Sequence, residues 1–188
     1  MRRAIDDAEA VARSRDGDLD AYAVLVARYT LRAHRAAFLL GAGEESDDVV
    51  QEAFVKAFRH LSRFRAGEPF APWLLRIVAN ETKNLTRARR RRTALALRLS
   101  AAEPGVTAHG PADEVLAAER RTQLLAAVNA LPDREREVLV CRYFLDLSEA
   151  ETAHVLEWPL GSVKSRTFRA LNRLRGRLVA GQGGVSRG

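Results

Sequence analysis

The clearest group of residues with a possible chemical role lies near the C-terminus, on a segment with helical periodicity. From residue 161 to residue 188 the chain has seven basic residues and no acidic residue. At helical spacing, one face of this segment carries Lys164, Ser165, Phe168, Arg169 and Arg173. Ser162 and Arg166 belong to the same segment and complete the candidate set. Basic groups neutralise phosphates and reach base edges, so the pattern favours a DNA-binding helix over an ordinary solvated basic face.

A second group, between residues 64 and 92, combines aromatic, amide and basic side chains. Aromatic rings offset the lost stacking of an extruded base, an amide reads a base edge, and basic groups neutralise the backbone. The candidates are Phe64, Phe70, Trp73, Arg76, Asn80, Lys83, Asn84, Arg87 and Arg90. Trp73 and Phe70 are equally well explained as core residues, which for Trp73 is the simpler interpretation from residue type alone. Asn80 is harder to explain in this way, because an amide among apolar residues needs a partner.

The sequence contains none of the familiar catalytic or metal-binding patterns. The histidines at 34, 60, 109 and 154 share no metal-ligand spacing, and Cys141 is the single cysteine. A phosphate-binding glycine loop and a Gly-x-Ser-x-Gly motif are both missing. We therefore expect no cofactor, no metal and no enzymatic activity. Cys141 lies in an apolar stretch and is expected to be a buried hydrophobe in a reducing compartment.

Composition is consistent with a folded protein that meets an anionic partner. The chain has 188 residues, of which 47% are hydrophobic, and a formal net charge of +7. The excess charge alone is a weak indication, because many basic proteins do not bind nucleic acid. No apolar run reaches the roughly 18–20 residues of a membrane span, and no secretory signal is recognisable at the N-terminus. We expect a cytoplasmic protein with no membrane insertion of its own.

Apolar residues recur with helical periodicity throughout the chain, and strand-like alternation is absent. We expect a first helix over residues 20–40, ended by Gly41 and Gly43. Ser46 is expected to cap a second helix, whose first turn is acidic. Pro72 suits the first turn of a third helix that leads towards the arginine run. The sequence therefore predicts an all-α protein.

The basic C-terminal segment belongs to a helix-turn-helix pattern. Ser148 and Glu151 are spaced as a capping box at the start of a short helix. Residues 157–161, with Pro159 among them, must break that helix, and a second helix should begin near Ser162. The residues of this second helix that should pack inward are Val163, Leu171 and Leu174.

The sequence indicates two small helical domains joined by a flexible linker. Between residues 99 and 113 the apolar periodicity fails, and Ser, Pro, Gly, Thr and His take over. The expected segments are an N-terminal tail at 1–15, a first domain at 16–94, a linker at 95–113, a second domain at 114–180 and a disordered tail at 181–188.

Several segments resemble the extracytoplasmic-function (ECF) sigma factors, group 4 of the sigma-70 family. Residues 131–139, 147–151 and 161–166 resemble region 4 of these proteins. Residues 47–54 and 69–80 resemble segments of region 2. The order of the two regions, with a linker between them, is that of the two-domain members. Departures from the family are confined to single positions, of which Glu157, in place of a common glycine, bears most directly on the geometry of the turn.

The resemblance implies an RNA polymerase sigma factor that directs core polymerase to one class of promoters and assists DNA melting. The first domain would recognise and melt the −10 element, and the second would read the −35 element with the basic helix. The polymerase β′ clamp helices would contact Asp48, Gln51, Glu52, Lys56 and Arg59. By residue type alone these form an ordinary polar helix surface. The polymerase β flap, promoter DNA and an anti-sigma factor are the other expected partners.

Two other interpretations fit the residues without the resemblance. The chain could be an autonomous helix-turn-helix repressor or activator, with its first domain used for dimerisation or sensing. It could also be an all-helical adaptor that binds only proteins. A repressor should protect a duplex operator by itself, whereas a sigma factor should need core polymerase and an adaptor should show no salt-dependent DNA binding.

Overall fold

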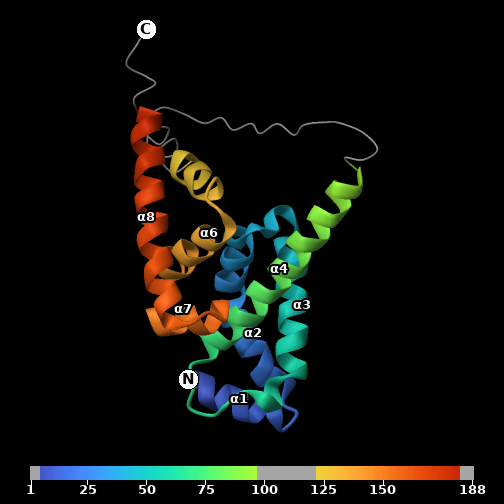
Figure 1. Cartoon of the computed structure of the whole chain (residues 1–188). Helices are drawn as coiled ribbons and strands as arrows, with labels where there is room; N and C mark the ends of the chain where they lie inside the picture. Colours follow the sequence, from blue (N-terminus) through green and yellow to red (C-terminus); the bar gives the residue numbers. More distant parts are fainter. Residues whose placement is uncertain (1–4, 97–121, 183–188) are drawn as a thin grey trace, which may run out of the picture.

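The computed structural model describes residues 5–96 and 122–182, and these residues confirm the all-α prediction because none of them forms a strand. A helical segment at 122–129 precedes α6. The labelled helices in Figure 1 are α1 (Asp7–Arg15), α2 (Leu19–Ala37), α3 (Ser46–Arg59), α4 (Phe70–Ala96), α6 (Asp133–Leu139), α7 (Glu149–Leu156) and α8 (Leu160–Gln182). Most of the predicted linker, the start of the second domain and most of the C-terminal tail fall outside the described residues.

Helix α1 occupies part of the segment that was predicted to be an N-terminal tail. Asp6 caps the helix by accepting a hydrogen bond from the Glu9 amide at 2.8 Å. Ala10 and Val11 are buried, and α1 packs against α2. The tail prediction is therefore wrong for residues 7–15, because this segment forms a capped helix that buries apolar side chains and whose Arg15 donates to the Leu61 carbonyl at 3.0 Å.

The join between α2 and α3 follows the predicted glycines but not the predicted cap. α2 passes into a π-helical turn over Phe38–Ala42, in which Gly41 has a φ of 113°, a backbone conformation that favours glycine. Ser46 is already inside α3, where its hydroxyl donates to the Gly43 carbonyl at 2.5 Å instead of capping the helix. The capping position is Glu45, which makes no side-chain cap hydrogen bond.

Helix α4 is a single helix that runs through Asn84 into the arginine run. It packs against α2 and α3, and the largest of its buried residues, which include Phe70, Leu74, Leu75 and Val78, lie in its first half. Its second half carries the basic side chains. One helix therefore links the core of the first domain to the candidate nucleic-acid face.

The helix-turn-helix is formed by α7 and α8, as predicted. Ser148 accepts from the Glu151 amide at 3.1 Å, and Glu151 accepts from the Ser148 amide at 2.7 Å, so the capping box is confirmed. α8 begins at Leu160, before Ser162. Val163 is buried as expected, but Leu171 is 39% exposed and Ala170 is buried in its place.

Removing the capping hydroxyl should measurably destabilise the protein. We expect Ser148→Ala to lower the free energy of unfolding by about 0.5–2 kcal/mol, because the Glu151 amide in the first turn of α7 loses the hydroxyl that accepts its hydrogen bond. Urea unfolding followed by circular dichroism measures the change. Ser148→Thr retains the hydroxyl, and its free energy of unfolding should fall by less. An equal fall in both variants would mean that the hydroxyl cap contributes little to stability.

The two domains pack against each other over a shared core. α4 of the first domain contacts α7 of the second, and Arg32 of α2 donates to the Leu145 carbonyl at 2.7 Å. Buried apolar residues of both domains join one continuous cluster. In Figure 1, α7 lies between α8 and the first domain, beside α4. The packing of the two domains therefore determines which of the predicted DNA-binding and polymerase-binding residues are exposed to solvent.

Candidate nucleic-acid interface

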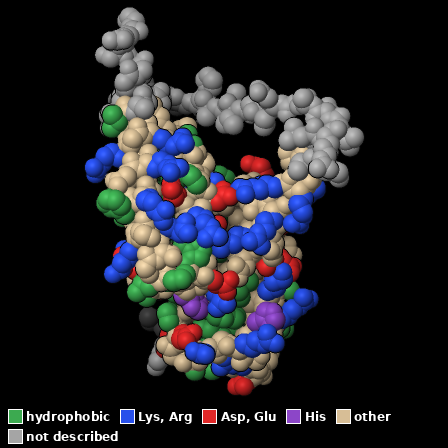
Figure 2. Space-filling view, viewed as in Figure 1, with side chains coloured by type: hydrophobic (Ala, Val, Ile, Leu, Met, Phe, Trp, Pro, Cys, Tyr) green, Lys and Arg blue, Asp and Glu red, His purple; other side chains and the backbone are tan. Residues whose placement is uncertain are grey.

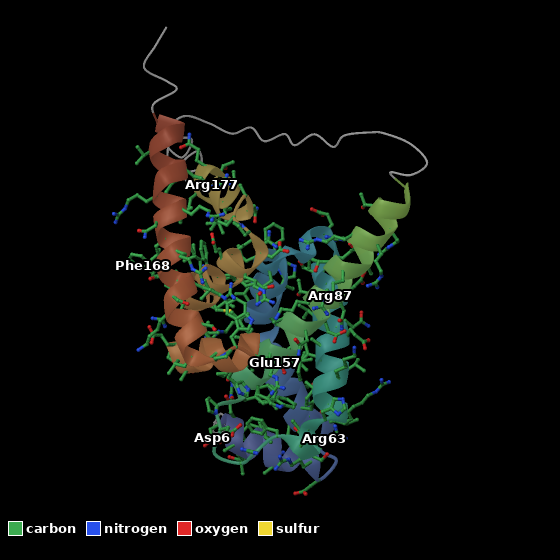
Figure 3. The ribbon with its side chains drawn as sticks, viewed as in Figure 1. Asp6, Arg63, Arg87, Glu157, Phe168 and Arg177 are labelled. Carbon is green, nitrogen blue, oxygen red and sulfur yellow. The ribbon has the colours of Figure 1, made fainter. Side chains whose placement is uncertain are left out.

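The outer face of α8 is open over most of its predicted contact residues. Lys164, Ser165 and Arg169 are exposed, and Phe168 has 68% of its surface exposed. Figure 3 shows Phe168 directed away from the rest of the domain. The Lys164 ammonium lies 3.6 Å from Glu149, and Arg169 donates to the Ser165 carbonyl at 3.3 Å. An exposed aromatic ring between basic groups suits apolar and hydrogen-bonding contacts in a DNA groove.

The two remaining arginines of the set lie on the flank of α8 and already have partners. Arg173 lies 3.1 Å from Glu135 of α6. Arg166 stacks over the ring of Trp158 at 5.1 Å, and Arg134 lies 5.9 Å from the same ring centroid. Ser162 is half-buried at the start of the helix. Trp158 and Arg134 were not among the predicted site residues, because only the fold brings this turn residue and α6 together.

The predicted aromatic contacts of the first domain are mainly core residues. Phe64 is 5% exposed and Phe70 is 1% exposed, and their ring centroids lie 5.7 Å apart. Trp73 is half-buried against both rings, at 5.2 Å and 5.6 Å. Neither phenylalanine can stack on a base in this arrangement, so we correct their assignment from DNA contacts to packing.

The polar candidates of the first domain follow one face of α4, and that face meets the second domain. Arg76 donates to Glu157 from its Nε at 2.8 Å, and Arg90 donates to Asp133 at 2.5 Å. Asn80, half-buried on the same face, makes no side-chain hydrogen bond within the described part of the chain.

Lys83 lies in the middle of this face, next to an acidic side chain of α6. Lys83 and Glu137 line a cavity of about 30 Å³ between the domains. Burial raises the pKa of the Glu137 carboxyl, and the positive charge of Lys83 opposes that rise. Asn84 and Arg87 are exposed. Figure 2 shows Lys and Arg side chains gathered in a band that crosses from the second domain onto α4.

The candidate polymerase surface of α3 is exposed and borders an apolar groove. Asp48, Gln51, Glu52 and Arg59 are exposed, whereas Lys56 is half-buried and donates to Glu81 at 2.6 Å. That bond to Glu81 raises the pKa of Lys56 and holds the ammonium on the α4 side of the helix. The groove was not predicted from the sequence; it has a volume of about 570 Å³ and is lined by residues of α2 and α3. Its apolar walls include Leu19, Val26, Val55 and Phe58.

Three further findings concern the chemistry of the described residues. Cys141 is buried as predicted, and burial raises the pKa of its thiol to about 12, so the thiol stays protonated at neutral pH. Across residues 5–96 and 122–182, no group of three or more His, Cys, Asp or Glu side chains is placed to hold a metal ion. Within the same ranges, no helix has the length and apolar character that a membrane crossing requires.

Comparison with known proteins places both domains in one family. Residues 20–92 match the family model of Sigma-70 region 2, and residues 121–174 match that of Sigma-70, region 4. The chain is 34% identical to the ECF RNA polymerase sigma-E factor of Escherichia coli over 180 residues, covering 90% of this chain and 93% of the relative. It is 30% identical to the ECF RNA polymerase sigma factor SigW of Bacillus subtilis over 177 residues, covering 89% of this chain and 94% of the relative.

Solved structures agree with this relationship. The structure of CnrH in complex with the cytosolic domain of CnrY has a TM-score of 0.69 and 28% identity, and the match covers 93% of this chain and 97% of CnrH. The fold is also that of the sigma factor RpoE from Bartonella quintana, with a TM-score of 0.66, 23% identity, and coverage of 86% of this chain and 96% of RpoE. With both regions matched in order and relatives covered nearly end to end, the chain belongs to the ECF RNA polymerase sigma factors.

Proposed function

We propose that the two domains divide promoter recognition, with α8 reading the −35 duplex and the polar face of α4 holding the −10 strand. The observation that supports α8 most strongly is the exposed patch of Lys164, Ser165, Phe168 and Arg169. These side chains stand at the start of the second helix of a helix-turn-helix, the part that enters the major groove. On α4, Arg76 and Lys83 would neutralise the backbone, and Asn80 would read an extruded base.

Polymerase is proposed to dock on α3. The exposed side chains of Asp48, Gln51 and Glu52 offer charge and hydrogen bonds, and the neighbouring groove offers apolar surface. A helical partner that fills such a groove and meets a polar rim is a common mode of recognition. The β′ clamp helices are the proposed partner here, and the β flap is the proposed partner of the second domain. The protein would act in the cytoplasm by binding, with no catalytic step of its own.

An anti-sigma factor is also part of the proposal. CnrH, which has a similar structure, was solved in complex with the cytosolic domain of CnrY. An autonomous repressor is not favoured, because the relatives are sigma factors over nearly their whole length. Run-off transcription with purified core polymerase on genomic promoter fragments tests the proposal. Specific transcripts should require both proteins; operator protection by the chain alone, without polymerase-dependent transcripts, would support a repressor instead.

Charge reversal on α3 should separate polymerase binding from folding. We expect the Asp48→Lys, Glu52→Lys double variant to bind core polymerase at least about tenfold more weakly, because like charges across an interface are costly. Affinity is measured by fluorescence anisotropy of labelled protein with core enzyme. The matched control is Glu44→Lys with Glu68→Lys, which makes the same charge change at exposed positions outside α3. Equal affinity of both variants, with normal helicity, would exclude this surface.

A further inference from the structure

The second domain places acidic side chains along the face of α4 that is proposed to hold DNA. Arg76, Lys83 and Arg90 are spaced by seven residues, about two helical turns, and therefore share one face. Glu157, Glu137 and Asp133 of the second domain lie against this face in the same order. We propose that these three carboxylates form an internal substitute for promoter DNA, which occupies α4 in the free protein and must leave before the −10 strand binds. The inference rests on the proposed function of α4.

The contacts at the two ends of this acidic surface are direct. Glu157 accepts from both Nε and Nη2 of Arg76, with the Nε bond at 2.8 Å. Asp133 accepts from Arg90 at 2.5 Å and also lies 3.2 Å from Arg136 of its own helix. Figure 3 shows Glu157 where the end of α7 meets α4. A carboxylate bound by an arginine fork presents the same kind of oxygen acceptors as a backbone phosphate.

The backbone of Glu157 gives independent support. This residue ends α7 in the left-handed conformation, with φ 58° and ψ 44°, where glycine is the favoured residue. A glutamate held there has a conformational cost that glycine would not have. The Glu157 side chain forms the ion pair with Arg76 across the two domains. This ion pair is a function that glycine at position 157 could not provide.

The ion pairs between the acidic residues and α4 are weak enough for the contact to be reversible. Arg76 and Glu157 are 42% and 47% exposed at the side chain, and Arg90 is 68% exposed. Ion pairs as exposed as these are weak and are screened by salt. Each pair should therefore shift the balance between closed and open domains only severalfold. Polymerase and DNA together can displace contacts of that size.

Energy transfer between the two domains tests the proposal on the full chain. Donor and acceptor dyes are placed at Ser62→Cys and Asn172→Cys, both exposed, while native Cys141 is buried and should not react. The Asp133→Asn, Glu157→Gly variant removes both direct ion pairs, and glycine suits the backbone at 157. We expect the ratio of open to closed molecules to rise about twofold to tenfold in this variant. High salt and a random-sequence single-stranded DNA should open the parent protein in the same way.

The matched control is Glu9→Gln with Glu68→Gln, which removes two acidic charges that pair only within the first domain. The proposal is overturned if transfer efficiency is the same in control and test variants, or if single-stranded DNA binds without opening the parent protein. Open-complex formation by Asn80→Ala holoenzyme separates this from the proposed function. If Asn80→Ala impairs open-complex formation but the Asp133→Asn, Glu157→Gly variant shows no domain opening, α4 remains the proposed −10 site and only the internal substitute for DNA is rejected. Normal open-complex formation by Asn80→Ala would reject both the −10 role of α4 and the internal substitute for DNA.

Discussion

Replacing Phe70 by alanine is expected to lower the free energy of unfolding by about 3–5 kcal/mol. The ring is 1% exposed and packs against Phe64, Trp73 and Tyr29, with centroids 5.3–5.7 Å away. Removing it leaves a cavity where the start of α4 meets α2. Urea unfolding followed by circular dichroism measures the loss.

Phe168→Ala is the matched control, because it deletes the same ring at a site that is 68% exposed. We expect its stability to change by less than about 0.5 kcal/mol, while its affinity for a −35 duplex falls. The two phenylalanines should therefore show opposite effects. A stable Phe70→Ala protein with weakened single-strand binding would restore Phe70 as a DNA contact and contradict its assignment to the core.

The helical architecture could be predicted from the sequence because its signals are local. The capping box of Ser148 and Glu151 and the helix-ending glycine at 41 act through neighbouring backbone atoms, and both are present as expected. The start of α3 shows the limit of such reasoning. A serine before two acidic residues is a good cap by type, but the turn from Gly43 brings Ser46 into the helix, where its hydroxyl bonds backwards.

The errors in packing have a different cause, because packing depends on partners far away in sequence. Leu171 is larger and more apolar than Ala170, and residue type therefore favours it as the inward residue. The structure buries Ala170, on the face of α8 that also buries Val163, and leaves Leu171 39% exposed. The structure places Phe64 and Phe70 in the core, and residue type alone could not decide this, since a phenylalanine that stacks on bases and one that fills a core look alike in sequence.

The candidate site was predictable in its residue types but not in its accessibility. The basic and amide residues of α4 have helical spacing, so their common face follows from the sequence. That Glu157 and Asp133 form ion pairs with this face depends on how two domains pack across a segment outside the described residues. No local pattern in either domain specifies that contact.

Substitutions at Arg169 and Asn80 should produce separable defects, one in duplex recognition and one in DNA opening. We expect Arg169→Ala to cost about 1–3 kcal/mol in binding to the −35 duplex, with relaxed specificity at one base pair, if its guanidinium reaches a base edge. Arg169 is exposed, and its guanidinium donates a hydrogen bond to the Ser165 carbonyl of its own helix, at 3.3 Å. Salt-controlled binding of holoenzyme to −35 variants measures the loss.

Asn80→Ala should spare −35 binding and impair formation of the open complex, since its amide lies on the α4 face proposed for the −10 strand. Permanganate reactivity on duplex and pre-melted templates measures opening for each mutant. A pre-melted template should rescue little of the Asn80 defect if the amide reads an extruded base, because the missing hydrogen bond is still needed after melting. It should rescue most of the defect if the side chain assists only melting. Loss of −35 binding in Asn80→Ala, together with normal −35 binding in Arg169→Ala, would show that the two domains had been assigned to the wrong promoter elements.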